Sequence, residues 1–263
     1  MKYLLVAIIS FLVFVGSIYK YFLVRKFPEE AVVEKALDGD TVKIEDGRLV
    51  RYIGINAPET RKKQEGDWIY DPEPFAEKAK FFNQNLVKGK KVRLEYDTRK
   101  KDVHNRLLAY VYAGNVFVNG EIIRQGYALS YFFPPNLKYA DKLLSLEQEA
   151  RENNRGFWFY VKSHPISFVD AGTHIGEIRM VEGRIRDTYR GEKVIRLNFG
   201  PDWRRDFHVT IFLNMLDRFK SQGISPTSYY KGKRVRVSGS IKEFDGCPEI
   251  AITDPSQIEV LEN

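Results

Sequence analysis

The sequence predicts a mainly β protein with some α-helix, in which two five-stranded barrels follow an N-terminal hydrophobic helix. Three observations support this fold class. Short runs that alternate apolar and polar residues are separated by turns rich in glycine and aspartate, as in small β-barrels. The order of three strands, a helix and two strands occurs twice along the 263 residues. Seventeen residues without a charge, 3–19, stand near the N-terminus.

The N-terminal segment is expected to contact a membrane. Its uncharged run is close to the lower limit for a spanning helix and slightly long for the core of a signal peptide. The small residues at 15–17 leave cleavage open, so we expect residues 1–26 to be a transmembrane anchor or a signal peptide, with membrane contact through residues 3–24 if they are uncleaved. This segment carries four basic residues and no acid, which is more than half of the net charge of +7. The isoelectric point of about 9.2 is therefore weak evidence for a polyanionic partner.

The first unit contains the elements of one barrel and its helices. Alternation of apolar and polar residues marks its strands. In its first helix, Pro74 lies near the first turn, apolar residues follow at spacings of three and four, and Gly89 lies just past the end. The expected elements are strands at 31–37, 41–45, 48–55, 91–97 and 107–113 and helices within 70–90, 118–126 and 136–154. This order suits a five-stranded oligonucleotide-binding (OB) barrel with appended helices, whose surface loops would carry the chemistry.

The second unit repeats this order without obvious sequence identity to the first. A segment with Pro165 and Gly172, residues 156–174, is expected to connect the two. The expected elements of the second unit are strands within 174–189, 192–200, 206–213, 232–241 and 248–261 and a short helix at 214–223. We therefore expect a second small barrel of the OB type. Because Cys247 is the only cysteine, the chain has no internal disulfide and must rely on its hydrophobic cores.

Charged residues gather in the turns and loops of the first unit. They lie in "DGDT" at 38–41, in "VRYIGINAPET" at 50–60 and in "RKKDVHNR" at 99–106. Hydrolysis of a phosphodiester needs a base that takes a proton from water, and positive charge around the phosphate oxygens. A glutamate, two arginines and a hard divalent cation held by carboxylates and carbonyls would meet these needs. Taken singly, each motif is more typical of an ordinary turn or a solvated loop.

Taken together and in this order, the motifs resemble the staphylococcal-nuclease-like, or thermonuclease, family. The resemblance covers roughly residues 31–158. The matching segments are "ALDGDTVKI" (36–44), "VRYIGINAPET" (50–60), "FAEKAKFF" (75–82), "DVHNRLLAYVYAG" (102–114), "VNGEIIRQGYA" (118–128) and "EQEARENNRGFW" (147–158). Ordered matches of this kind are far more specific than any single short motif.

The resemblance implies a set of catalytic and metal-binding residues. Arg51 and Arg106 would bind the scissile phosphate and stabilise its developing charge. Glu59 would be the general base that activates the attacking water. The carboxylate of Asp40 and the backbone carbonyl of Ala57 would ligate a calcium ion.

Other positions depart from the family pattern or stand next to it. Asn56 replaces an aspartate that ligates calcium in the family, so we expect weaker calcium binding or tolerance of another divalent cation. Tyr131 matches a tyrosine that lines the nucleotide pocket. Phe133 stands where a second tyrosine is often found and keeps its stacking face. Asp38 lies across a glycine from the matched ligand and is expected to serve the turn.

The implied function is a calcium-dependent endonuclease. The family cleaves single-stranded or frayed DNA and RNA and leaves 3′-phosphates. The second unit resembles OB-type nucleic-acid-binding domains, so it would assist substrate binding. The alternative is a non-catalytic nucleic-acid-binding or assembly protein on a degenerate nuclease fold, and the presence of Arg51, Glu59 and Arg106 favours the enzyme. The sequence offers no evidence for a protein partner.

The resemblance also sets the expected domain limits and location. The expected domains are an anchor or signal peptide at 1–26, a thermonuclease-like domain at 27–160, a linker at 161–173 and a second OB domain at 174–263. Basic residues on both sides of the hydrophobic run leave its orientation open. By resemblance, we expect a membrane-anchored protein with an extracytoplasmic nuclease domain, or a secreted protein if the N-terminal segment is cleaved.

Overall fold

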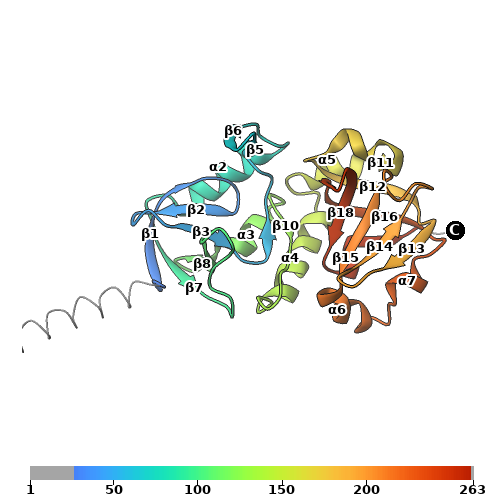
Figure 1. The fold of residues 1–263 in the computed structure, drawn as a ribbon. Helices are drawn as coiled ribbons and strands as arrows, with labels where there is room; N and C mark the ends of the chain where they lie inside the picture. The colour runs from blue at the N-terminus through green and yellow to red at the C-terminus, as the bar shows by residue number, and fades with distance from the viewer. Residues whose placement is uncertain (1–26, 262–263) are drawn as a thin grey trace, which may run out of the picture.

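A computed structural model describes residues 27–261 as two β-rich units joined through helices (Figure 1). The predicted N-terminal hydrophobic helix, and with it the anchor or signal peptide at 1–26, lies outside the described residues. Within residues 27–261, no helix has both the length and the apolar character that a membrane span requires.

Five strands of the first unit close into a barrel. β1 (Glu30–Ala36) pairs antiparallel with β2 (Thr41–Ile44), which pairs antiparallel with β3 (Leu49–Tyr52). β3 runs parallel to β8 (Leu107–Ala113), and β8 is antiparallel to β7 (Lys91–Glu95). Pairing of β7 with β1 completes the ring. The closed five-stranded barrel predicted for this unit is therefore confirmed, and each of its five strands lies where alternation placed it.

Helices and short strands surround this barrel. The helices are α2 (Ala76–Val87), α3 (Val118–Arg124), α4 (Ala140–Glu152) and α5 (Trp158–Ser163). The short strands are β4 (Ile55–Asn56), β5 (Arg61–Gln64), β6 (Asp67–Tyr70), β9 (Val116–Phe117) and β10 (Leu129–Ser130). The predicted helices at 118–126 and 136–154 are confirmed by α3 and α4.

The prediction for 70–90 is correct for the helix but wrong for its start. Tyr70 ends β6, which forms a hairpin with β5, and α2 begins at Ala76. The prolines at 72 and 74 explain the late start, because the residue before a proline is pushed away from the helical conformation. The hairpin itself was not predicted, since β5 is entirely polar and carries no apolar alternation.

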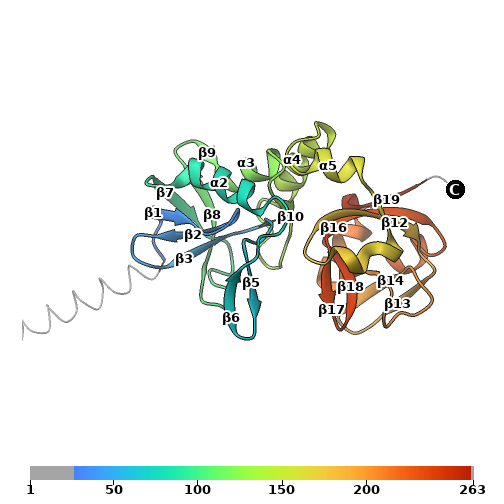
Figure 2. The ribbon, with the colours of Figure 1, turned by 90° about the horizontal axis from the view of Figure 1, so that it is seen from above.

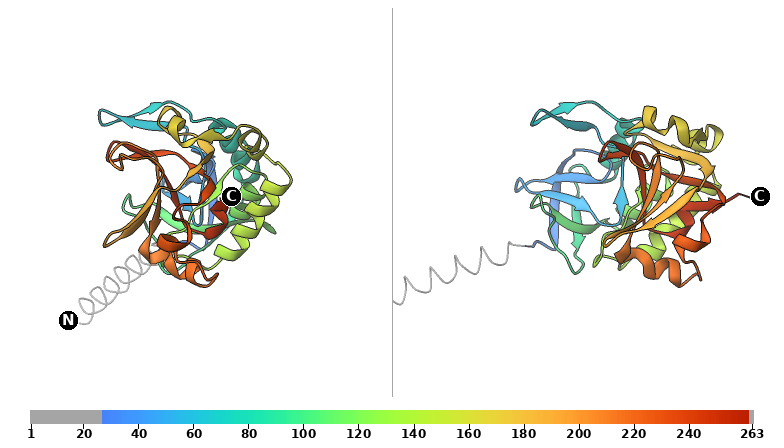
Figure 3. Two further views of the ribbon diagram at one scale, coloured as in Figure 1. Left: turned by 90° about the vertical axis from the view of Figure 1, so that its right-hand side faces the viewer. Right: turned by 45° about the vertical axis from the view of Figure 1, so that its right-hand side comes forward.

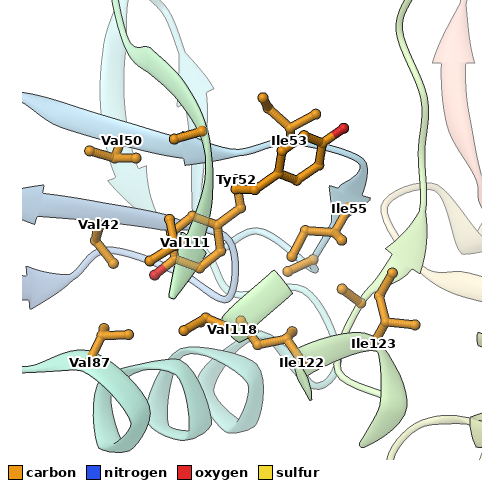
Figure 4. Close-up of a cluster of buried hydrophobic side chains, with 14 of the residues drawn as sticks. Val42, Val50, Tyr52, Ile53, Ile55, Val87, Val111, Val118, Ile122 and Ile123 are labelled. Carbon is orange, nitrogen blue, oxygen red and sulfur yellow. The ribbon is translucent and has the colours of Figure 1, made fainter. Parts of the chain in front are cut away.

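The core of the first unit lies between the barrel and its helices. Buried side chains from the strands meet side chains from α2 and α3 (Figure 4). Those labelled in Figure 4 are Val42, Val50, Tyr52, Ile53, Ile55, Val87, Val111, Val118, Ile122 and Ile123. Because α2 and α3 contribute to the same cluster as the strands, they pack on the barrel and complete its core.

The second unit consists of two sheets around its own buried cluster. One sheet has the strand order β11-β12-β16-β19 and the other β13-β14-β15-β18-β17. The strands are β11 (Ile166–Ser167), β12 (Ile178–Arg184), β13 (Asp187–Arg190), β14 (Val194–Asn198), β15 (His208–Phe212), β16 (Arg234–Ser240), β17 (Lys242–Phe244), β18 (Cys247–Ile252) and β19 (Ile258–Val260). The helices are α6 (Leu216–Lys220) and α7 (Pro226–Tyr229), with 3₁₀ turns η1 (Phe168–His174), η2 (Leu213–Met215) and η3 (Pro255–Gln257). Because the pairings fall into two sheets, a second closed five-stranded barrel stays a prediction.

The segment predicted as a linker, 161–173, has structure of its own. It contains the end of α5, all of β11 and most of η1. Ile166 pairs with Val181 of β12, and Ala171 is fully buried in the second core. This segment therefore packs on the second unit.

The first and second units are in contact with each other. Met215, at the end of η2, belongs to the buried cluster of the first unit. In Figures 2 and 3 the β5–β6 hairpin of the first unit projects beside the β17–β18 hairpin of the second. The second unit thus lies close to the part of the barrel that carries the predicted site.

Candidate active site

A buried carboxylate stands at the centre of the predicted site. Asp40, in the turn between β1 and β2, is only 2% exposed. Its side chain accepts hydrogen bonds from the backbone N–H of Ala57 (2.7 Å) and the hydroxyl of Thr41 (3.1 Å). It also forms an ion pair with Arg51, with 2.9 Å between Oδ2 and Nη2. A buried charge needs such partners, so this pair fixes the turn against the exit of β3.

The turn "DGD" owes its shape to its first two residues. Asp38 accepts a hydrogen bond from the backbone N–H of Asp40 (3.0 Å), which is the turn role expected from the sequence. Gly39 packs where no side chain fits: a Cβ there would lie 2.5 Å from the Cβ of Ala57 and 2.8 Å from the Cβ of Ala79. Glycine therefore lets the turn approach both the strand exit and α2.

Arg51 spans the exit of β3. Its Nη1 donates to the carbonyl oxygens of Tyr52 (2.9 Å) and Ile55 (2.8 Å). Its Nη2 donates to the side-chain oxygen of Asn56 (3.3 Å) as well as to Asp40. One nitrogen of the planar guanidinium thus contacts side-chain oxygens of both Asp40 and Asn56, two of the predicted metal ligands.

Glu59 follows Pro58 at the end of the same loop and is held by a second acid. The backbone N–H of Glu59 donates to the carboxylate of Glu73 (2.9 Å), and the N–H of Glu73 donates to the carbonyl of Glu59 (2.9 Å). These two hydrogen bonds fix the backbone of Glu59 and do not involve its own carboxylate. The half-buried side chain can therefore serve as a proton acceptor.

Several carboxylates repel one another at this site. Burial, and then the charge of Asp40, raises the pKa of Glu59 to about 7, although Arg51 and Lys242 oppose the rise. Burial, and then the charges of Asp40 and Glu59, also raises the pKa of Asp38 well above its usual range. A cation bound here would offset this repulsion.

Arg106 is held by a neighbouring acid. It directly precedes β8, in which Leu108 is the register partner of Arg51 on β3. Arg106 itself lies two residues before Leu108, in the loop that leads into this strand. The Nε of Arg106 donates to the carboxylate of Asp102 (2.7 Å). In the described part of the chain, no hydrogen bond or ion pair joins Arg106 to Arg51 or Glu59.

The two predicted nucleotide-binding aromatics lie at the junction of the units. The backbone N–H of Tyr131 donates to the carbonyl of Gly54 (3.0 Å), next to the strand exit that Arg51 spans. The rings of Tyr131 and Phe133 are 5.6 Å apart. Phe133 in turn is 6.3 Å from the ring of Phe212, which ends β15 in the second unit. The sequence did not indicate this contact across the units.

Two charged residues near Glu59 were missed from the sequence. Glu73 lies in "DPEP" before α2, and an acid between two prolines could have indicated a fixed turn. Lys242 begins β17 in the second unit, and its charge acts on both Glu59 and Glu73. No local signal marks Lys242, because it is far from this site in sequence.

The donor atoms at the site fit a hard divalent cation. Asp40 supplies a carboxylate, Asn56 an amide oxygen and Ala57 a backbone carbonyl, which are oxygen ligands that calcium accepts. Among the described residues, no group of three or more His, Cys, Asp or Glu is arranged to hold a metal ion. The fit therefore rests on one carboxylate with neutral oxygens, and a bound cation would favour the ionised forms of the nearby acids Asp38 and Glu59.

The first unit is thus a closed OB-type barrel with a buried acid–arginine pair at its rim. The family model for staphylococcal nuclease homologues matches residues 49–160. The thermonuclease of Staphylococcus intermedius is 35% identical over 133 residues, which are 49% of this chain and 76% of that protein. Endonuclease YncB of Bacillus subtilis (strain 168) is 36% identical over 131 residues, which are 48% of this chain and 60% of that protein. The chain belongs to the staphylococcal nuclease family.

Proposed function

We propose that this protein is a metal-dependent endonuclease that hydrolyses phosphodiester bonds of single-stranded or frayed DNA or RNA. The observation that carries the proposal is the placement of Asp40, Arg51 and Glu59 around one strand exit. Relatives named thermonuclease and endonuclease support the same activity. A retained acid, base and arginine would have no evident purpose in a non-catalytic scaffold.

The residues would divide the chemistry as follows. Glu59 accepts a proton from water as the water oxygen forms its bond to phosphorus. Arg51 and Arg106 face the phosphate and stabilise the negative charge that grows on its oxygens. The bond from phosphorus to the 5′-oxygen breaks, the 5′-oxygen takes a proton from solvent, and the other product keeps a 3′-phosphate. Calcium, or another divalent cation, would be held by Asp40, Asn56 and Ala57 and would supply further positive charge.

The other parts of the chain would bring substrate to this site. Tyr131 and Phe133 offer aromatic faces on which bases of a single strand can stack. We propose that the second unit is an OB-type domain that assists substrate binding. The parallel pairing of β15 with β18 and the antiparallel pairing of β12 with β16 support an OB-like strand arrangement. Residues 1–26 would hold the enzyme on a membrane with its catalytic unit extracytoplasmic, or direct secretion if they are cleaved.

Cleavage of labelled single-stranded DNA and RNA by the full chain tests this function. We expect cleavage with calcium, none with EDTA, and a fall of about 100-fold or more for Glu59→Gln, because the base would be lost. Glu45→Gln is a matched control, since Glu45 is an exposed acid at the end of β2. Binding without cleavage under every metal condition would instead favour the non-catalytic nucleic-acid-binding protein.

A further inference from the structure

Lys242 of the second unit lies beside the candidate active site in the first. We propose that Lys242 binds a backbone phosphate of the single-stranded substrate next to the scissile one, so that the second unit forms one wall of the active site. This inference rests on the proposed nuclease function and deepens it. The family match at 49–160 does not reach the second unit. The inference names the residue through which that unit would contribute to substrate binding.

A short chain of contacts places Lys242 near the catalytic loop. Glu73, which holds the backbone of Glu59 through two hydrogen bonds, also lies against the second unit: a Cβ on Gly176 would be 3.3 Å from its carboxylate oxygen. The N–H of Gly176 donates to the carbonyl of Ile241 (2.8 Å), the residue directly before Lys242. The backbone that carries Lys242 is therefore linked to the loop of the predicted base, Glu59, through Gly176 and Glu73.

The ammonium group of Lys242 remains available to a ligand. Its side chain is exposed, and within residues 27–261 it takes part in no hydrogen bond or ion pair. Its charge nevertheless lowers the pKa of Glu73 against the larger effect of burial, in keeping with the contacts that join this segment to Glu73. By contrast Lys62, on the facing hairpin, is already paired with Asp71 at 3.0 Å.

The surroundings of Lys242 favour a single strand of nucleic acid as the ligand. Phe244, two residues on along β17, shares its face and is exposed, so a phosphate contact and a stacking surface stand together. The β5–β6 hairpin projects beside β17 and β18 (Figure 2). It carries exposed Trp68 and Tyr70 on β6 and basic residues on β5. Basic groups interleaved with aromatic faces are typical of surfaces that track a single strand.

Binding to a cleavage-deficient protein tests the role of Lys242 apart from catalysis. The full chain with Glu59→Gln would be titrated with a fluorescein-labelled oligothymidylate of about 12 nucleotides at several salt concentrations. Adding Lys242→Gln should weaken binding about fivefold at 0.1 M salt and lower the slope of log K against log salt by about 0.7, the value for one phosphate contact on a single strand. Lys242→Arg should restore most of both.

The matched control is Lys193→Gln, since Lys193 is also an exposed lysine of the second unit. An affinity and a salt slope unchanged by Lys242→Gln would overturn the proposal, as would an equal loss for Lys193→Gln. If Lys242 only joined the two units, its substitution would lower the midpoint of thermal unfolding and leave the salt slope unchanged. Cleavage by the wild type, measured in parallel, tests the proposed function separately. If binding depends on Lys242 but the wild type cleaves no substrate, the nuclease function is contradicted and the role of Lys242 in binding is supported.

Discussion

At the scale of single residues, Asn56 is the departure that bears most on the proposed metal site. Its side-chain oxygen accepts a hydrogen bond from Arg51, so it faces the same point as the carboxylate of Asp40. An amide oxygen can ligate calcium but adds no negative charge. The proposed calcium site would thus keep the ligand position and lose one charge relative to the pattern that the family resemblance implies.

We predict that Asn56→Asp strengthens metal binding. The added charge should lower the calcium concentration for half-maximal cleavage by about tenfold, because calcium affinity rises with the number of charged ligands. The measurement is a calcium titration of cleavage rate, with Asn85→Asp on the exposed side of α2 as the control. Identical activation curves for Asn56→Asp and wild type would show that Asn56 is not a ligand.

A second buried acid gives a pH-dependent prediction for stability. Glu147 on α4 is buried and accepts a hydrogen bond from the backbone N–H of Ser130. Burial raises its pKa above the ordinary value of 4.5, although Ser130 and Arg151 lower it and Asp254 raises it further. The folded protein therefore holds this proton more tightly than the unfolded chain. The stability that Glu147 contributes is fully present below pH 4.5 and is lost as pH rises through the raised pKa.

We expect Glu147→Gln to remove this loss. Its amide oxygen can still accept the hydrogen bond from Ser130, but it carries no charge at any pH. Urea unfolding of both proteins at several pH values should show the variant gaining in free energy of unfolding relative to wild type as pH rises above 4.5. Parallel pH profiles for the two proteins would rule out Glu147 as the source.

At the scale of elements, the β1–β2 turn depends on Gly39 for its contact with α2. The turn places Asp40 against Ala57, and the space for any side chain at Gly39 is already filled. We predict that Gly39→Ala lowers the free energy of unfolding by about 1–3 kcal/mol through overpacking and also weakens cleavage, because Ala57 must move. Gly172→Ala is the control, since no atom lies within 4 Å of its Cβ position. Wild-type stability and cleavage in Gly39→Ala would contradict this account.

Elements also show where sequence reasoning succeeds. The strands of the first barrel were predicted because each alternates apolar and polar residues, and the loop from Arg51 to Glu59 was recognised because it is one of several ordered motifs that resemble a family pattern. The β5–β6 hairpin was missed because "RKKQ" buries no apolar residue, and its pairing with "DWIY" is set by the turn between them. Periodicity detects burial, so an exposed hairpin leaves no such signal.

At the scale of the whole molecule, Arg218 joins the two units. Its Nε pairs with Asp254 at 2.8 Å and its Nη2 with Asp141 of α4 at 2.9 Å. Asp254 is 4% exposed as a side chain, whereas Asp141 is 93% exposed. The guanidinium also lies 5.7 Å from the ring centre of Phe132 in the first unit. Loss of this arginine therefore leaves one buried carboxylate without its ion-pair partner.

We predict that substitutions of Arg218 and Asp141 change the free energy of unfolding by unequal amounts. Arg218→Ala should lower the free energy of unfolding by about 2 kcal/mol, because Asp254 stays buried without its partner. Asp141→Ala should change it by less than about 0.5 kcal/mol, since exposed ion pairs contribute little. Denaturant unfolding of the full chain measures both, and equal effects would show that the buried pair with Asp254 stabilises the protein no more than the exposed pair with Asp141.

The amino-acid sequence by itself determined the first barrel, its helices and the loop that carries Asp40, Arg51 and Glu59. The strands and helices follow from side-chain periodicity and turn chemistry over short stretches, and the loop was assigned from the resemblance of its motifs to a family pattern. The tertiary structure alone decided that the segment before Lys242 reaches the Glu73–Glu59 loop through Gly176, and that Phe212 meets Phe133. Both depend on how the surfaces of two units pack together, and residues so far apart in sequence leave no local pattern of their contact. The physical reason is that the burial of one face of a strand leaves a pattern in neighbouring residues of the sequence. The junction of the units instead depends on the shape and charge of two surfaces whose residues are far apart in the sequence.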